Sequence, residues 1–225
     1  MNSPRKNSLD IRLLSALSAE NSSTRLQTVL AVGTHPEPGF VDALVERCAV
    51  EPDFYVRDML TWALTRLPSQ LTVPRLQMEL GSKSAQARSQ ALHTLSKIGD
   101  RNAWPAITQS LLHDADDQVA RSAWRAAVVL VPDEDKETLA AELVKEFGRG
   151  DREVQLSLSR ALVTLGDVIE PLLQPGMVSQ NPAVHAHASA TERLLRDPEA
   201  GFDLAVDAAR RVVALGPERQ GLATC

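Results

Sequence analysis

A repeated pattern with a spacing of about thirty residues constrains the fold of this chain more than any other feature. Six short segments can be aligned on a central polar residue, and these centres are Arg25, Arg57, Arg88, Arg121, Gln155 and His185. Successive centres lie 30 to 34 residues apart. Such spacings are typical of solenoids, in which each unit packs only against its neighbours. The sequence therefore predicts six stacked units.

Each aligned segment has the features of an α-helix. Apolar residues recur at helical spacing, as Val56, Leu60 and Leu64 do around Arg57. Aligned on Arg121, the fourth unit has its apolar positions at Ala120, Trp124, Ala127, Val128 and Val131. A short polar residue that can cap a helix N-terminus stands four residues before each centre, and these residues are Asn21, Asp53, Ser84, Asp117, Asp151 and Asn181. We therefore expect six long helices.

Shorter helices are expected between the long ones. They cover approximately residues 38–48, 71–80, 102–112, 134–147 and 167–173. Pro74 and Pro105 fall in the first turn of two of them, where the missing N–H of proline costs nothing. Each unit is thus predicted to be a helical hairpin, and the predicted fold class is all-α, an α-solenoid of about six hairpins.

The hairpins are expected to form a single repeat domain over residues 9–215. The segment 198–215 is rich in apolar residues and is followed by a Gly-Pro pair, which indicates a C-terminal helix that caps the open end of the stack. Residues 1–8 and 216–225 are expected to be flexible ends.

The repeats resemble HEAT repeats, a family of α-solenoids related to the armadillo type. The segment Asp53-Phe54-Tyr55-Val56-Arg57 is similar to the Asp-x-x-Val-Arg that opens the second helix of such a repeat, and the segment 84–99 is the next most similar. The resemblance extends over about residues 9–196. It implies that second helices line a concave surface, but it says little about function, because one fold serves many functions.

The recurring arginines allow two interpretations. Arg25, Arg57, Arg88 and Arg121 could form a ladder of guanidinium groups for binding phosphate. In proteins that resemble this one, however, such residues commonly tie one repeat to the next. We therefore expect these four arginines to be structural.

A candidate binding strip runs along the second helices. Trp62 lies off the apolar stripe, and its equivalents in the later units are His93, Ala126, Arg160 and Ala190. Neighbouring positions on the same helical face add Asp58 and Arg125. An aromatic residue beside arginine and histidine has the composition of a binding hot spot. The predicted partner-binding residues are Asp58, Trp62, His93, Arg125 and Arg160, and the competing interpretation is an ordinary amphipathic surface.

No motif for catalysis, phosphate binding or metal binding is found in the sequence. His185 and His187 are two residues apart, so on a helix they point in different directions and do not form a pair of metal ligands. Cys48 ends an apolar helix and is expected to be a buried thiol, whereas Cys225 lies in the C-terminal tail. We expect a protein that is not an enzyme and binds neither a cofactor nor a metal.

The overall charge bears on the choice of partner. The formal charge is -5, which gives no general attraction to phosphate and argues against nucleic acid as the ligand. A non-catalytic scaffold that binds a protein partner is the leading hypothesis. The alternatives are DNA binding, by resemblance to HEAT-like DNA alkylation glycosylases, help in cofactor attachment, by resemblance to HEAT-like bilin lyases, and the sensing component of a bacterial regulatory system.

Localisation is expected to be cytoplasmic. Charged residues interrupt the N-terminal segment before any apolar region typical of a signal peptide can form. The apolar run at residues 126–131 is far shorter than the roughly 20 residues that span a bilayer. The sequence leaves the oligomeric state open.

Overall fold

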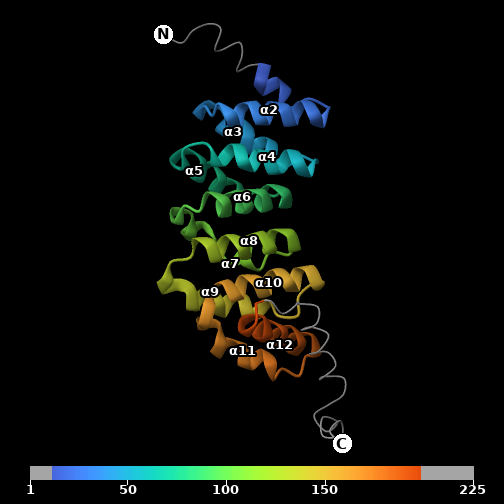
Figure 1. Cartoon of the computed structure of the whole chain (residues 1–225), viewed down its shortest axis with the longest axis vertical. Helices are drawn as coiled ribbons and strands as arrows, with labels where there is room; N and C mark the ends of the chain where they lie inside the picture. The colour runs from blue at the N-terminus through green and yellow to red at the C-terminus, as the bar shows by residue number, and fades with distance from the viewer. Residues whose placement is uncertain (1–11, 199–225) are drawn as a thin grey trace, which may run out of the picture.

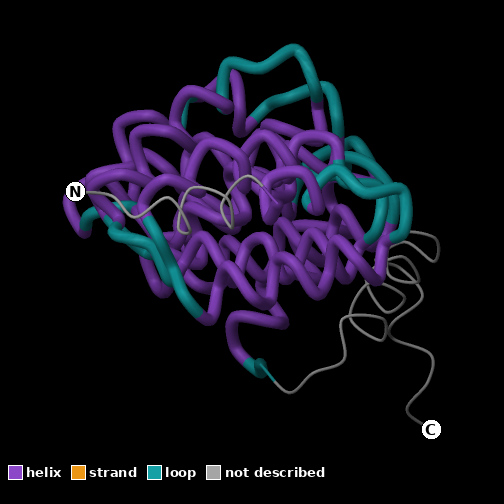
Figure 2. Tube along the Cα trace, turned by 90° about the horizontal axis from the view of Figure 1, so that it is seen from above, coloured by secondary structure: helices purple, strands orange, loops and turns teal. Residues whose placement is uncertain are grey.

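The computed structural model describes residues 12–198 as a stack of helices without a strand among these residues (Figure 1). One layer holds the long helices, which are α2 (Ser22–Thr34), α4 (Phe54–Thr65), α6 (Ala85–Ile98), α8 (Asp117–Leu130), α10 (Arg152–Thr164) and α12 (Pro182–Arg196). Each long helix packs on the next one in the stack. Figure 2, which views the stack from its end, shows successive helices lying nearly over one another. The predicted all-α solenoid is confirmed.

A second layer holds the shorter helices of the hairpins. They are α3 (Val41–Val50), α5 (Ser69–Glu79), α7 (Gln109–Leu112), α9 (Lys136–Leu143) and α11 (Glu170–Met177). Several of them begin with a 3₁₀ turn, as α3 does after Pro38–Phe40. Residues 12–16 form the described part of a further helix before α2. The predicted C-terminal helix, the flexible ends and Cys225 lie outside the described residues, apart from residue 198.

N-terminal caps fix where the long helices start. The side chains of Asn21, Asp53 and Ser84 accept hydrogen bonds from backbone N–H groups in the first turns of α2, α4 and α6, as predicted. Asp151 and Asn181 do the same for α10 and α12. Because the cap satisfies N–H groups that have no partner within the helix, it decides the starting residue.

The cap of α8 differs from the prediction by one residue. Asp116, and not Asp117, accepts the hydrogen bonds from the N–H groups of Gln118 and Val119. The apolar positions of the fourth unit therefore shift by one as well. The buried residues that correspond to the stripe of α4 are Val119, Ala123, Ala126, Ala127 and Leu130. Arg121 is thus not the structural equivalent of Arg57, and that position is held by the buried Ala120.

Two predictions for the shorter helices also need correction. Helix α5 begins at Ser69, so Pro74 lies inside it and not in its first turn. The helix expected over residues 102–112 is broken into a 3₁₀ helix, Arg101–Ala106, and α7, with extended backbone at Thr108 between them. Pro105 lies inside the 3₁₀ segment and lacks the N–H that would donate to residue 101 in a continuous α-helix.

The core runs continuously along the interface between the two layers. Trp124 is the largest fully buried side chain, and its indole N–H donates to the Leu112 carbonyl at 2.9 Å. Polar side chains buried between consecutive long helices pair with each other, as Thr61 does with Thr94 and Ser159 with Thr191. These bonds satisfy hydroxyl groups that would otherwise be costly to bury.

Two of the four recurring arginines join consecutive repeats, as predicted, and a third, Arg57, binds only the loop before its own helix. Arg25 and Arg88 each bind a carboxylate 26 residues further along the chain, on Glu51 and Asp114 respectively. Each also donates to two carbonyl groups in the loop before its own helix. Arg57 keeps the carbonyl contacts, to Glu51 and Pro52. A structural role is therefore confirmed for these arginines, and Arg121 falls outside the pattern.

Candidate functional site

The residue nine positions after each N-cap lies on the same face of every long helix. In order along the stack these residues are Leu30, Trp62, His93, Arg125, Arg160 and Ala190. The corrected start of α8 brings Arg125 into this series in place of Ala126, which is fully buried. Four of the five predicted site residues therefore occupy equivalent positions on α4, α6, α8 and α10.

A groove of about 400 Å³ lies over α6, α8 and α10. Three of the predicted residues, His93, Arg125 and Arg160, line this groove. Lys97 and Arg121 also line it, and neither was among the predicted site residues. We call this surface the basic groove, because it carries four permanent cations and one carboxylate, that of Glu153.

The single carboxylate neutralises little of this charge. Glu153 is 63% exposed, and its nearest contact with Arg121 is 3.7 Å, too long for a hydrogen bond. The Nε atom of Arg121 is buried without a hydrogen-bond partner among the described residues. Exposed pairs of this kind contribute about 0–1 kcal/mol. The groove therefore keeps most of its positive charge available.

Arg125 is held in position by its own helix. Its Nε donates to the Arg121 carbonyl at 3.1 Å, and its Nη2 lies 3.5 Å from the Ser122 hydroxyl. Partial burial and the neighbouring positive charge of Arg121 lower the pKa of Arg125. A nearby anion would act against both effects, since it favours the charged form of the side chain.

Arg160 differs from Arg125 in having no such anchor. Its side chain is exposed, and within residues 12–198 it has no hydrogen bond or ion pair. Lys97, one turn after His93 on α6, is exposed too and likewise makes no ion pair within that range. Two cations of the groove are thus available to a ligand without breaking an existing interaction.

His93 lies half-buried in the wall of the groove and is neutral at neutral pH. Burial lowers its pKa, and the positive charges of Arg125 and Lys97 lower it further, whereas Asp58 acts in the opposite direction. Its imidazole can donate one hydrogen bond and accept one. It therefore adds hydrogen-bonding capacity to the groove without adding charge.

Apolar side chains complete the groove. Val128 and Val129 come from α8 and Leu156 comes from α10. Val129 is 46% exposed, although it is a large aliphatic residue. The basic groove therefore combines an aliphatic surface with surrounding cations, and this combination suits a ligand that has both apolar and anionic groups.

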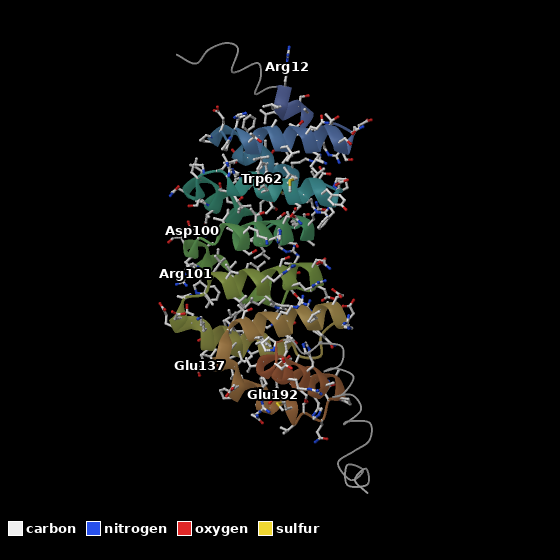
Figure 3. The ribbon with its side chains drawn as sticks, viewed as in Figure 1. Arg12, Trp62, Asp100, Arg101, Glu137 and Glu192 are labelled. Carbon is white, nitrogen blue, oxygen red and sulfur yellow. The ribbon has the colours of Figure 1, made fainter. Side chains whose placement is uncertain are left out.

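Trp62 and Asp58 do not line the basic groove. Trp62 is half-buried on α4 (Figure 3), and its six-membered ring lies over Gly33 of α2. A Cβ atom added at Gly33 would come within 2.2 Å of Trp62 Cζ3. Asp58 is exposed on α4, near enough to His93 to influence its charge. The structure thus brings three of the five predicted residues together and leaves these two on the adjoining surface.

The remaining candidates for reactive chemistry are structural. Burial raises the pKa of the Cys48 thiol to about 12, so it is not a nucleophile at neutral pH. His187 is fully buried, with its Nδ1 accepting from the Gly148 N–H, whereas His185 lies half-exposed. No cluster of three or more metal-ligating side chains is found within residues 12–198.

The comparisons with known proteins bear on the repeats. Residues 41–128, from the start of α3 almost to the end of α8, match the family model of HEAT repeats. The resemblance seen in the sequence is therefore confirmed for this part of the chain. None of the curated proteins matches the chain. No helix described by the structure is long and apolar enough to cross a membrane.

The solved structures that are similar to this chain include two with the same TM-score. One is an engineered protein, 17% identical, with a TM-score of 0.48 over 84% of this chain and 98% of that chain. The other is the complex of CpcE and CpcF of phycocyanin lyase from Nostoc sp. PCC7120. It is 18% identical, with a TM-score of 0.48 over 88% of this chain and 85% of that chain.

Proposed function

We propose that this chain is a non-catalytic, cytoplasmic binding module that recognises a protein partner on the face formed by α4, α6, α8 and α10. The observation that carries the proposal is the basic groove itself. Its aliphatic and charged side chains lie side by side on a surface built by three consecutive repeats, and the side chains of Arg160 and Lys97 make no ion pair within residues 12–198. Residues that do not serve the fold are the ones available for recognition.

The distribution of roles along the repeats supports this assignment. Arg25 and Arg88 are used to join neighbouring repeats. Arg125 and Arg160 belong to the same layer of long helices as Arg25 and Arg88. Unlike those two arginines, they contact no carboxylate of the described residues. Solenoids present long, rigid surfaces of this kind, on which adjacent repeats contribute side chains to one ligand.

A photocrosslinking experiment tests the proposal. A photoreactive amino acid replaces Val129, which is exposed in the groove, and in a matched control it replaces Met78, which is 73% exposed on α5 in the other layer. We expect a crosslinked protein from cells that carry the Val129 variant and none from the Met78 variant. Crosslinks from Met78 alone, or from neither position, would contradict binding at the groove.

A further inference from the structure

We propose that the segment bound in the basic groove is an acidic peptide in which carboxylates flank an aliphatic side chain. This inference rests on the proposed protein-binding function and specifies the chemistry of the partner. It depends on three features of the groove, which are its unbalanced charge, its aliphatic surface and the different restraint of its two central arginines.

The charge of the groove is opposite to that of the chain as a whole. The full sequence has a formal charge of -5, yet the groove gathers Lys97, Arg121, Arg125 and Arg160 around the single carboxylate of Glu153. Such a local reversal of charge attracts an anionic segment and disfavours a basic one. Guanidinium groups bind carboxylates through paired hydrogen bonds, so arginine suits this ligand better than lysine does.

The aliphatic surface favours a peptide over a nucleic acid. Val128, Val129 and Leu156 lie among the cations, where a sugar-phosphate backbone would offer them less apolar surface than an aliphatic side chain. A peptide can place one aliphatic side chain against these residues while its neighbouring carboxylates reach the cations. The cations that line the groove come from α6, α8 and α10, and Asp58 lies beyond them on α4. A duplex requires phosphate contacts along a longer track.

The two central arginines, Arg125 and Arg160, differ in how firmly they are held before a ligand binds. Arg125 is positioned before binding by the Arg121 carbonyl, so fixing it costs little side-chain entropy. Arg160 has no partner among the described residues and can adjust to the ligand. Neutral His93 on α6 can donate to a carboxylate or to a peptide carbonyl. We therefore expect both arginines to contribute to affinity, with Arg125 also setting the position of the peptide.

Fluorescence anisotropy with labelled probes tests the inference on the full chain. The first probe is a fluorescein-labelled peptide in which glutamates flank one leucine, and the second replaces that leucine with serine. The third reverses the charge by placing lysines where the first has glutamates, and the fourth is a single-stranded oligonucleotide of similar charge. We expect the first probe to bind most tightly, with an affinity that falls as salt increases.

Paired variants connect binding to the groove. Arg125→Gln combined with Arg160→Gln should weaken binding of the first probe by about tenfold or more, since two charge-assisted contacts are lost. Arg12→Gln combined with Arg101→Gln is the matched control, because it removes the same charge from exposed positions away from the groove (Figure 3). Its affinity should stay within about twofold of the parent protein. Far-UV circular dichroism verifies that both pairs are folded.

Each remaining outcome has a defined meaning. Tighter binding of the oligonucleotide than of the first probe, or equal losses in the two arginine pairs, would overturn the acidic-peptide inference. Equal binding of the leucine and serine peptides would overturn the role of the aliphatic surface. A groove crosslink at Val129 together with no affinity for any acidic probe would refute this inference alone, whereas absence of that crosslink refutes the protein-binding function.

Discussion

Arg25 and Glu51 form a buried, two-pronged ion pair that joins α2 to the end of α3. Arg25 Nε donates to Glu51 Oε2 at 2.7 Å, and Nη2 donates to Oε1 at 2.6 Å. The Glu51 side chain is fully buried and also accepts from Arg47 and from the Asp53 N–H. Burial alone would raise the pKa of Glu51, but these hydrogen bonds lower it to about 2. The carboxylate therefore organises the junction between the first two repeats.

We predict that Glu51→Gln lowers the free energy of unfolding by about 3 kcal/mol, because it leaves the buried Arg25 charge without its partner. Urea denaturation followed by circular dichroism at neutral pH measures the loss. Asp42→Asn is the matched control, because Asp42 also pairs with an arginine, Arg75, but is 77% exposed. The control should lose less than about 1 kcal/mol. Similar losses in the two variants would show that burial does not strengthen the Arg25 pair.

The contact between Gly33 and Trp62 gives a second prediction. Replacing a helical glycine with alanine usually stabilises a helix by about 1 kcal/mol. At Gly33 the new methyl group would collide with the indole ring, so we expect Gly33→Ala to destabilise the protein by about 1–3 kcal/mol. The intrinsic fluorescence should also change, because Trp62 must move. Gly39→Ala, where nothing lies within 4 Å of the added atom, is the control. A stabilised Gly33→Ala variant would contradict the packing described for Trp62.

His187 makes the stability of the folded protein depend on pH under acidic conditions. Burial lowers its pKa from 6.5 to about 4, so it is neutral in the folded protein. The unfolded chain takes up a proton at higher pH than the folded protein does. The stabilising contribution is therefore complete above about pH 6.5 and is lost as the pH falls towards 4, by about 3 kcal/mol in total.

His187→Gln removes this titrating group, and urea denaturation over the same pH range measures the effect. The variant should be less stable at neutral pH but should lose less stability between pH 6.5 and 4. His185→Gln, which removes a half-exposed histidine from the same helix, is the matched control. If stability depended on pH equally in the His187 variant and the parent protein, the buried neutral histidine would not be the cause of that dependence.

Most of the architecture could be predicted from the sequence, because each long helix carries its own cap and apolar stripe. Among the long helices the exception was α8. Either of two adjacent aspartates could cap this helix, and an apolar stripe shifted by one residue would still consist of apolar side chains. The choice depends on packing that local sequence does not contain. Trp124 must reach the Leu112 carbonyl, and this contact fits a helix capped by Asp116.

The candidate site was predictable in part for the same reason. Position along the repeat identified His93 and Arg160, which are half-buried and exposed respectively, whereas Arg125 was added as a neighbour because the shifted alignment placed Ala126 at that position. Lys97 and Arg121 were missed, although Lys97 lies one turn after His93 and could have been found by extending the same face. Arg121 was assigned to the structural arginines through the shifted alignment. The place of Trp62 depended on Gly33, 29 residues earlier, and only the packing of α2 on α4 shows that contact.

His113 makes stability depend on pH in the direction opposite to His187. Its Nδ1 lies 2.5 Å from Glu146 Oε1 and its Nε2 lies 3.1 Å from Glu142 Oε2. Carboxylates only accept hydrogen bonds, so both ring nitrogens must carry protons for both contacts to form. Burial opposes this charge, but the hydrogen bonds to Glu146 and Glu142 prevail and raise the pKa of His113 above 6.5.

We therefore predict that the His113 contribution is fully present below about pH 6.5 and is lost as the pH rises through the raised pKa. An NMR titration of the His113 ring should give a pKa above 6.5, and Glu142→Gln together with Glu146→Gln should bring it down. Lys145 and Arg149 also bind these two carboxylates, so the His113→Gln variant is needed to separate their effect. That variant should lose stability at pH 6 and show a weaker dependence on pH above 6.5 than the parent protein. A His113 pKa below 6.5 in the intact protein would show that burial outweighs the two carboxylates.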